Sequence, residues 1–488
     1  MADFQGLRLL SNGTDMDADA ESGRGTAAIP LLEQGPGRDG PSMSGQVLRL
    51  AGPVLVEQFL LYLVGLSDTL LTARYLGEDD LAAVANATYL LWFLGSLMTV
   101  VSVGATALVA RLTGAGEPRQ AARTCQQAIF LALSLGSAVL LLGLALAPAV
   151  VDLLELEGRA ADGAVLFLRL ILLASPLLAC ATAGIACLRG VGDTRTGMWV
   201  MILVNAINVG LSWGLVSGLG IFPSQGFAGI AIGTAISEAV GGLAVLVILA
   251  RGRSGLRLDP AGLRPRWRES WRILRISLPA SGESLTNVFC QMWFLRLINH
   301  LGPTASAAHG VAIRCEALAF LTVTAFSVAA GTLTGQYLGA GRPDLAARAG
   351  RTAWAIGVAV LMAVGVLLYA EAGAMFHLFL GGRQPEVTAE GVPVLRIVAF
   401  ALPGLATLNV LNGALRGAGD TRWPWIIVMV GYLGIRMPLT YWFTLGPESG
   451  GLGLGLRGAW FAMLADLTLR GVLVAARYLH GGWKTARV

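Results

Sequence analysis

Asp68 is a carboxylic acid inside a long apolar stretch of the chain. An ionised group surrounded by hydrocarbon is energetically costly unless it is paired. Burial favours the protonated form of a carboxylic acid, so such a group can take up a proton and release it when water arrives. Asp68 is therefore a candidate proton carrier. The alternative is an interfacial acid that caps its helix and pairs with Arg74.

Glu57 and Glu283 are two further acids in apolar stretches, and each lies four residues after a proline. In a transport site they would face a cleft, where they would attract a cation or carry a proton. The alternative is a structural ion pair near the lipid headgroups, with Arg49 or Arg275 as the partner. Their matching positions favour the structural interpretation slightly, and both interpretations stay open.

Uncharged polar residues form a second group of candidates. Asn205, Asn208 and Ser212 are spaced to share one face of a helix, and Glu238 follows Thr234 by one helical turn. Such residues often hydrogen-bond neighbouring helices in a membrane. They are also the side chains that could hold a coupling ion beside Asp68.

The second half of the chain carries several charges in or beside apolar runs, namely Arg296, Arg314, Glu316, Arg396, Arg436 and Asp466. We expect opposite charges among them to pair between helices, while Arg314, Arg436 and Asp466 could instead line a polar cleft. His309 has no second ligand at metal spacing, so we expect it to be a packing residue rather than a proton carrier.

Aromatic residues in the apolar runs could offer their faces to an organic cation. The alternative for each is ordinary packing or an interfacial belt. The candidates are Tyr62, Tyr89, Trp92, Phe93, Trp293, Phe294 and Trp460.

The elements that must position these residues are membrane helices. Of the 488 residues, 55% are hydrophobic and only 13% are charged, about half the charged share of a soluble protein. Twelve apolar runs are each long enough to span a bilayer as a helix, and none shows the alternation of a strand. The expected spans are 50–73, 84–110, 124–148, 165–188, 197–218, 228–250, 276–299, 307–335, 351–372, 392–414, 424–445 and 457–478.

Charges in the loops predict the orientation. The loops after the even-numbered spans hold most of the basic residues, which are Arg111, Arg119, Arg123, Arg189, Arg195, the arginines from 251 to 275, Arg342, Arg348, Arg351, Arg416 and Arg422. Basic residues favour the cytoplasmic side, so we expect both termini in the cytoplasm. This placement accounts for the net charge of +5 without any nucleic acid.

The chain also contains an internal repeat. Three motifs recur after 225 to 227 residues: 48–53 in 274–279, 114–118 in 339–343, and 188–195 in 415–422. The repeated loops fall on the same side, so the halves are parallel repeats, as in many secondary transporters. We expect a disordered cytoplasmic tail over 1–45, six-helix bundles over 46–250 and 273–480, a basic cytoplasmic linker over 251–272 and a short tail over 481–488.

Other classes of protein find little support. The string Gly453-x-Gly455-x-x-Gly458 opens an apolar run and follows no strand, which is the wrong context for dinucleotide binding. No GxxxxGK[ST] or HExxH motif is present, and the five cysteines form no CxxC. We therefore expect a transporter and not an enzyme, with no cofactor and no bound metal.

In the order of its motifs, the chain resembles the multidrug and toxic compound extrusion (MATE) family of the multidrug/oligosaccharidyl-lipid/polysaccharide (MOP) exporter superfamily. The resemblance covers roughly residues 46–480 and rests on Asp68-Thr69, the paired LRGxGDTR loops, Asn205-x-x-Asn208, Gly229-Ile-Ala-Ile-Gly-Thr234, Ala307-Ala-His309 and Arg436-x-Pro438. The spacing from Pro53 to Glu57 is closer to the DinF-like branch than to the NorM-like branch.

The resemblance implies two six-helix bundles around a central cleft, which export organic cations in exchange for H⁺ or Na⁺ by alternating access. The family's ion-coupling positions map onto Asp68, Asn208 and Thr234, and the fourth, often an Asp, falls at Ser212. This loss of a carboxylate favours H⁺ over Na⁺, although Na⁺ could bind at the other three. Tyr62, Trp293, His309 and Arg436 join the two glutamates as cleft candidates.

A monomer in a bacterial inner membrane is expected from the same resemblance. The rival interpretation is a flippase for lipid-linked oligosaccharides from the same superfamily. A flippase needs a cleft rich in arginine to bind pyrophosphate, whereas the arginines within the spans here are few and mostly accompanied by acids.

Overall fold

The computed structural model describes residues 42–77, 80, 91, 93–152, 158–218, 223–259, 264–446, 448, 450–486. Most of the expected acidic tail lies outside the described residues, as do Tyr89 and Trp92 from the aromatic candidates. Within the described residues the secondary structure is helical, with a single isolated bridge between Arg253 and Leu256 after the sixth span.

The first half contains α1 (Met43–Tyr75), α3 (Ser102–Gly114), α4 (Pro118–Asp152), α5 (Gly158–Gly190), α6 (Thr194–Ser217) and α7 (Phe227–Ala250). The second half contains α8 (Trp267–Asn299), α9 (Pro303–Gly339), α10 (Pro343–Ala370), α11 (Ala372–Leu380), α12 (Pro385–Gly417), α13 (Arg422–Gly431), the π-helical segment η2 (Tyr432–Arg436), α14 (Met437–Thr444) and α15 (Gly455–His480). A final 3₁₀ turn, η4, covers Gly482–Thr485.

The predicted all-helical membrane architecture is confirmed. Among the described residues, eleven helical stretches are long and apolar enough to cross a membrane, including Phe93–Gly114, which contains α3. The helix at the position of the remaining predicted span is α8, whose 33 residues suffice in length but are more polar. Apart from the short apolar helix α11, these helices reproduce the twelve predicted spans.

Two details differ from the predicted spans. The helices extend past the apolar runs, and α8 begins at Trp267 rather than near 276, because an amphipathic turn at the membrane surface can still make helical hydrogen bonds. The eleventh span is not one regular helix but α13, η2 and α14 in sequence. A π-helical turn of this kind often marks a functional position.

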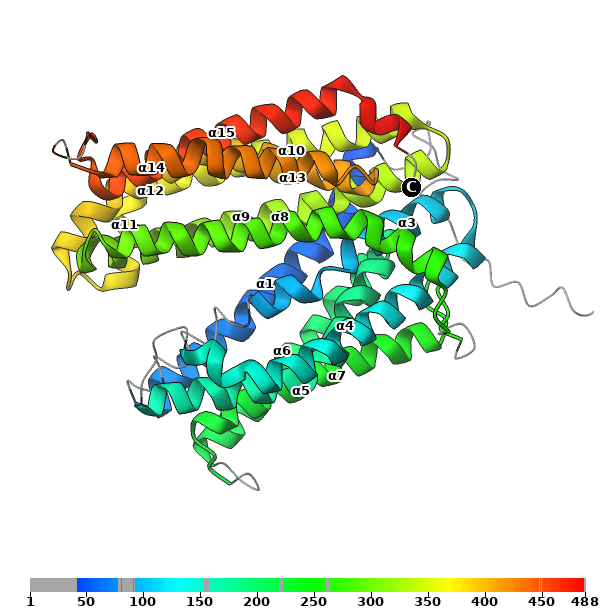
Figure 1. The fold of residues 1–488 in the computed structure, drawn as a ribbon, viewed down its shortest axis with the longest axis horizontal. Coiled ribbons are helices and arrows are strands. Elements are labelled where there is room, and N and C mark those ends of the chain that lie inside the picture. The colour runs from blue at the N-terminus through cyan, green and yellow to red at the C-terminus, as the bar shows by residue number, and fades with distance from the viewer. Residues whose placement is uncertain are drawn as a thin grey trace, which may run out of the picture.

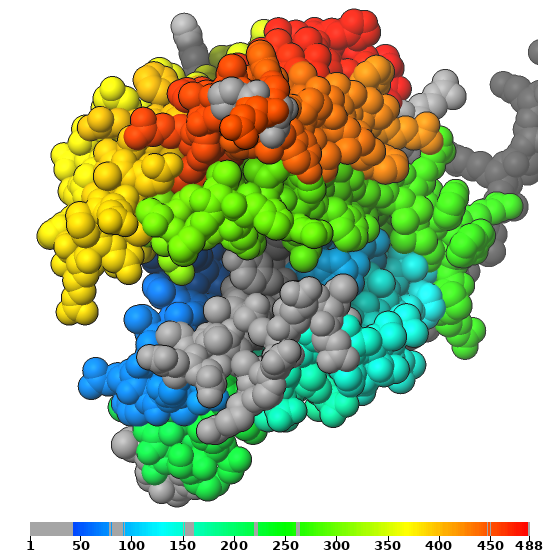
Figure 2. Space-filling model, turned by 60° about the vertical axis from the view of Figure 1, so that its left-hand side comes forward, coloured from blue at the N-terminus to red at the C-terminus, as the bar shows by residue number. Residues whose placement is uncertain are grey.

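The helices form two bundles that diverge from a common end. In Figure 1 the bundle of α3 to α7 and the bundle of α9 to α15 meet near the C-terminus and separate toward the end where α11 lies. The space-filling view also shows the two masses apart where the far ends of α1 and α11 lie (Figure 2). The molecule is therefore V-shaped, with a cleft between the bundles.

Helices α1 and α8 each contribute to both bundles. Met43 and Leu50 of α1 belong to the hydrophobic core of the second bundle, whereas Leu60 and Leu71 pack on the core of the first. Similarly, Ile273 at the start of α8 is buried in the first bundle, and the later part of α8 lies in the second. These two crossing helices join the bundles where they meet.

The closed end of the V is the end that carries the basic loops, and we call it the arginine-rich end. It is formed by the helix ends that hold Arg111, Arg189 and Arg416 and by the loop that holds Arg342. There the Ser277 hydroxyl lies 2.9 Å from the backbone N–H of Gly104, which donates to it. The Thr332 hydroxyl donates to the carbonyl oxygen of Arg189 over 3.1 Å. If this end is cytoplasmic, as the loop charges predict, the cleft opens to the outside.

Glycines permit this close contact. A Cβ atom on Gly339 would overlap the carbonyl oxygen of Arg111, and one on its repeat equivalent Gly114 would overlap that of Gln336. Backbone atoms cannot move aside as a flexible side chain can, so a larger residue must separate the helices.

We expect Gly339→Val to open the arginine-rich end. Spin labels at the exposed residues Gln120 and Asp344, at the starts of α4 and α10, should give a longer distance by double electron–electron resonance. The control is Gly65→Ala, because a Cβ there meets nothing within 4 Å. An unchanged distance distribution in Gly339→Val would contradict this expectation.

Candidate functional site

Asp68, Asn208 and Thr234 form one hydrogen-bonded cluster from α1, α6 and α7. The Thr234 hydroxyl donates to Asp68 Oδ2 over 2.8 Å. Asn208 Nδ2 lies 3.3 Å from Asp68 Oδ1 and 3.0 Å from Thr234 Oγ1. Asp68 is 3% exposed, Thr234 2% and Asn208 fully buried. Two residues that lie 140 and 166 positions from Asp68 thus surround its carboxylate with neutral donors.

The structure does not show Asp68 paired with Arg74, which was the alternative interpretation of this acid. Among the described residues its partners are the amide and the hydroxyl, and Arg74 instead lies over the ring of Tyr75, 5.9 Å from the centroid. The Ser67 hydroxyl donates to Asn208 Oδ1 over 3.1 Å, a contact that the sequence analysis missed. Its only signal in the sequence is its position next to Asp68.

Glycines place α7 against α6 at this cluster. A Cβ on Gly233 would contact the backbone of Ser212, and one on Gly229 would contact Leu215. The small residues let the two helix backbones approach, as is common in membranes. The glycine spacing before Thr234 therefore brings its hydroxyl within reach of Asp68.

The other predicted ion-coupling residues lie around this cluster rather than in it. Ser212 Oγ is buried and has no hydrogen-bond partner within the described structure. Asn205 donates to the carbonyl of Met201 in its own helix over 2.9 Å. Glu238 is partly buried on α7, near enough to Asp68 for the two carboxyl groups to interact electrostatically.

Glu57 and Glu283 are buried and form ion pairs, but with different partners from those considered in the sequence. Glu57 Oε1 lies 2.8 Å from Arg189 Nη2, and Glu283 Oε1 lies 2.7 Å from Arg416 Nη2. Pairing with Arg49 or Arg275 was therefore wrong. The arginines of the repeated LRG motifs, at the ends of α5 and α12, are the ones whose side chains reach the two glutamates. Their similar offsets from the glutamates, 132 and 133 residues, were the available signal.

The second bundle contains a buried charge cluster. Asp466 Oδ2 accepts from Arg436 Nε over 2.8 Å and from Arg470 Nη2 over 2.6 Å. Both guanidinium groups also lie over the ring of Tyr432 in η2, at 4.7 Å and 4.5 Å from the centroid. Arg436 donates to Gln291 as well, over 3.0 Å. The predicted pairing between helices holds for Asp466, and Arg470, one turn away from it, was missed.

The remaining charges of this half behave differently. Arg296, Arg314 and Arg396 are exposed on their helices, and Arg396 lies 5.4 Å from the ring centroid of Tyr369. Glu316 is partly buried and interacts electrostatically with Arg436. Arg314 therefore does not contribute to the buried cluster.

His309 is a buried packing residue. Its ring lies between Phe294 and Trp460, with centroid distances of 5.8 Å and 5.4 Å. Trp293 donates to the Tyr441 hydroxyl over 3.3 Å, so it is linked to the eleventh span. Tyr62 is partly buried on α1, and Phe93 is exposed.

The two LRGxGDTR loops end in acids that tie helices together. Asp193 accepts from the backbone N–H of Thr196 at the start of α6 and pairs with Arg253 over 2.9 Å. Burial raises the pKa of Asp193, but hydrogen bonds from Arg253, Thr196 and Ser254 outweigh it and hold the pKa below its ordinary value. In the repeat, Asp420 pairs with Arg477 over 2.7 Å.

Comparison with known proteins identifies the fold and the family. A family model described as MatE matches residues 53–213 and again 279–442, once in each half. The probable multidrug resistance protein NorM of Thermotoga maritima is 30% identical over 459 residues, which are 93% of this chain and 96% of that protein. The protein of the same description from Deinococcus radiodurans is 33% identical, over 89% and 94% of the two chains.

Solved structures agree on the fold. The outward-facing conformation of a multidrug resistance MATE family transporter of the MOP superfamily superposes with a TM-score of 0.82 at 21% identity, covering 90% of this chain and 97% of that one. The DinF-like assignment stays a prediction, because these comparisons do not specify a branch. With the helical bundles, the repeated match and these relatives, the chain is a multi-pass membrane protein that belongs to the MatE family, the multidrug and toxic compound extrusion transporters.

Proposed function

We propose that this protein is a secondary active multidrug exporter, which expels small organic cations in exchange for H⁺ by alternating access. The names of its relatives from Thermotoga maritima and Deinococcus radiodurans, probable multidrug resistance proteins, support the substrate class. The bacterial relatives support a bacterial inner membrane location, and the loop charges support a cytoplasmic position for both termini.

The Asp68 cluster is the observation that carries the proposal. The carboxylate is held by an amide and a hydroxyl and by no basic side chain within the described structure. A buried acid without a cationic partner exchanges a proton at less cost than one held by an arginine. A change in the charge of Asp68 would alter the hydrogen bonds between α1, α6 and α7 together.

The choice of H⁺ over Na⁺ follows from the fourth position of the cluster. Ser212 contributes a neutral hydroxyl where a second carboxylate would strengthen the attraction for a metal cation. Glu238 supplies a second acid nearby, from α7 rather than α6. With two acids close together, protonation of one relieves repulsion from the other.

A proposed cycle follows from the V shape. With the arginine-rich end closed, protons reach Asp68 from the outer cleft, the helix contacts rearrange, and the affinity for the cationic substrate falls. Release of the substrate and entry of the proton are thereby linked through one group. The return to the inward-facing state carries the proton to the cytoplasm.

The test is ethidium transport in energised inverted vesicles, with the H⁺ and Na⁺ gradients collapsed separately. Loss of transport on collapse of the pH gradient alone is the expected result. Dependence on Na⁺ alone would overturn the choice of coupling ion, and it would mean that Ser212 does not disable a Na⁺ site. No transport under either gradient would count against drug export.

The flippase alternative gains little from the geometry. Arg189 and Arg416 at the arginine-rich end, and Arg436 and Arg470 in the second bundle, are each engaged by an acid, Glu57, Glu283 or Asp466. An arginine already paired with a carboxylate offers less attraction for a pyrophosphate.

A further inference from the structure

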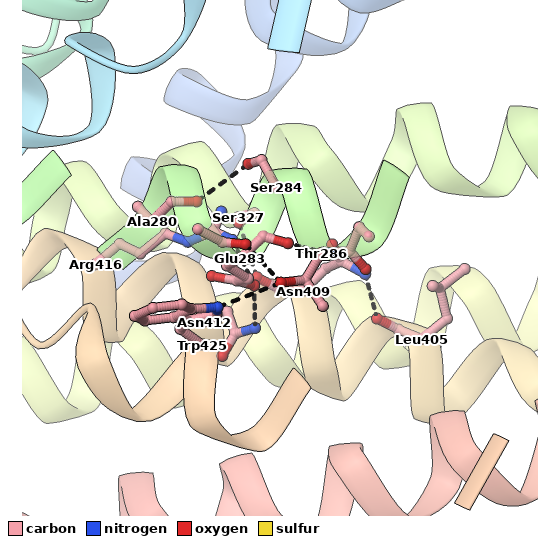
Figure 3. Close-up of polar contacts among 12 residues, drawn as sticks. Ala280, Glu283, Ser284, Thr286, Ser327, Leu405, Asn409, Asn412, Arg416 and Trp425 are labelled. Carbon is pink, nitrogen blue, oxygen red and sulfur yellow. Dashed lines mark hydrogen bonds and ion pairs between the residues drawn. The ribbon is translucent and has the colours of Figure 1, made fainter. Parts of the chain in front are cut away.

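The second bundle has a wall of four polar residues, of which its repeat equivalent keeps only one. Around Glu283 lie polar residues on α8 and α12, and Figure 3 shows several of them pointing toward one another. They are Thr286, Asn287, Asn409 and Asn412. At the offsets of the repeated motifs, the first bundle has Leu60, Leu61, Thr182 and Ile185 instead.

Comparison of the two bundles shows which of these residues the repeated fold requires. Both bundles keep the buried glutamate and its arginine, so that ion pair belongs to the repeated architecture. The first bundle forms its Glu57 pair with Ile185 at the position of Asn412. The amide beside Glu283 is therefore not required to hold the helices together, and its presence calls for another reason.

Two buried acceptor oxygens in this wall have no partner in the described structure. Asn412 Nδ2 lies 3.3 Å from Glu283 Oε1, which also accepts from Arg416. That leaves Glu283 Oε2 and Asn412 Oδ1 unpartnered, although both residues are 4% exposed or less. Glu57 Oε2 is likewise unpartnered in the first bundle, so Asn412 Oδ1 is the acceptor that the second bundle adds. Buried acceptors without a donor are unfavourable, so a donor is expected in some state of the protein.

The position of Glu283 and Asn412 indicates the conformational state in which they meet a donor. Glu283 lies on α8 fewer than two turns beyond Ser277, whose hydroxyl closes the arginine-rich end against Gly104. Separation of the bundles there would uncover the start of α8 and the wall behind it. Arg416, with 31% of its side chain exposed, already connects the pair to the surface.

We propose that Glu283 and Asn412 form the site where a substrate's N–H-bearing cationic group binds when the arginine-rich end is open. This inference rests on the proposed export function. It specifies the chemistry of the site at which the substrate first binds, which we call the entry site. The site offers a carboxylate, paired on one side with Arg416, and two free acceptor oxygens, which suits amidinium or ammonium groups. In the outward-open form Glu283 and Asn412 are buried, so the substrate cannot bind to them again after it has entered the cleft.

The test compares two cationic probes in inverted vesicles: 4′,6-diamidino-2-phenylindole, whose amidinium groups donate hydrogen bonds, and tetraphenylphosphonium, which has no donor. Asn412→Leu removes the amide and nearly keeps its shape. We expect the KM for the amidinium probe to rise about tenfold, the effect of one charge-assisted hydrogen bond. The KM for tetraphenylphosphonium should stay within about twofold, which also shows that the variant is folded.

Asn412→Ile, which installs the residue of the first bundle, is the second variant and should behave in the same way. Ile185→Leu, at the equivalent position, is the matched control and should change neither KM. Equal rises for both probes, or no rise for either, would overturn the proposal. If wild-type vesicles transport tetraphenylphosphonium but not the amidinium probe, the entry site fails while drug export stands. If they transport neither probe, it is the proposed function that fails.

Discussion

Asp68→Asn is expected to abolish proton-driven export while leaving the protein folded and in the membrane. Asparagine has nearly the same shape and can keep hydrogen bonds with Asn208 and Thr234, but it cannot take up or release a proton. Transport of ethidium into inverted vesicles driven by a pH gradient should therefore fall to the level of vesicles without the protein. Exchange of substrate across the membrane without any gradient should persist, because that step needs no proton.

The control for this prediction is Asp344→Asn. Asp344 is an exposed acid at the start of α10, and the nearest basic group is Lys484 at 4.0 Å. Its neutralisation should leave transport unchanged. Wild-type rates of gradient-driven export in Asp68→Asn would show that the coupling proton is carried elsewhere, and Glu238 would be the next residue to substitute.

The largest effect on stability is expected for Asp466→Leu. Asp466 is completely buried and is the shared partner of Arg436 and Arg470, which are themselves 1% and 2% exposed. Its removal leaves two guanidinium groups buried without their carboxylate. Breaking a buried pair in this way costs about 3–5 kcal/mol. Thermal unfolding of the detergent-solubilised protein should show a clear fall in the melting temperature relative to wild type.

Removal of the whole cluster should be less harmful than removal of its acid alone. A triple variant with Asp466→Leu, Arg436→Met and Arg470→Met leaves no unpaired charge, so much of the lost stability should return. Asp344→Leu serves as the control, since an exposed pair contributes about 0–1 kcal/mol. A melting temperature of Asp466→Leu equal to that of wild type would mean that water reaches the arginines.

Much of the architecture was predictable because, in a bilayer, the hydropathy of each segment determines its secondary structure. Long apolar runs must become helices in hydrocarbon, since every backbone group has to be hydrogen-bonded within its own segment. The repeated LRGxGDTR loops gave the parallel halves, and the grouping of Asp68, Asn208 and Thr234 was available from the resemblance. The sequence also predicted the span in α8, although this helix is more polar than the other spanning helices.

Side-chain partners could not be obtained in the same way. Arg49 and Arg275 are near the two glutamates in sequence, yet Arg189 and Arg416 are the partners, because α1 and α8 cross between bundles. The π-helical turn that places Arg436 beside Tyr432 leaves no trace in an apolar run.

The sequence by itself thus determined the helical spans, the repeat and the family, since these depend on local hydropathy and short motifs. Only the tertiary structure decided which charges are paired and which acceptors remain free. It also decided which end of the cleft is closed, through contacts such as that between Gly339 and Arg111. Those outcomes depend on contacts between helices that are more than a hundred residues apart in the sequence. Such contacts stabilise the protein only after the bundles have formed and the chain is ordered.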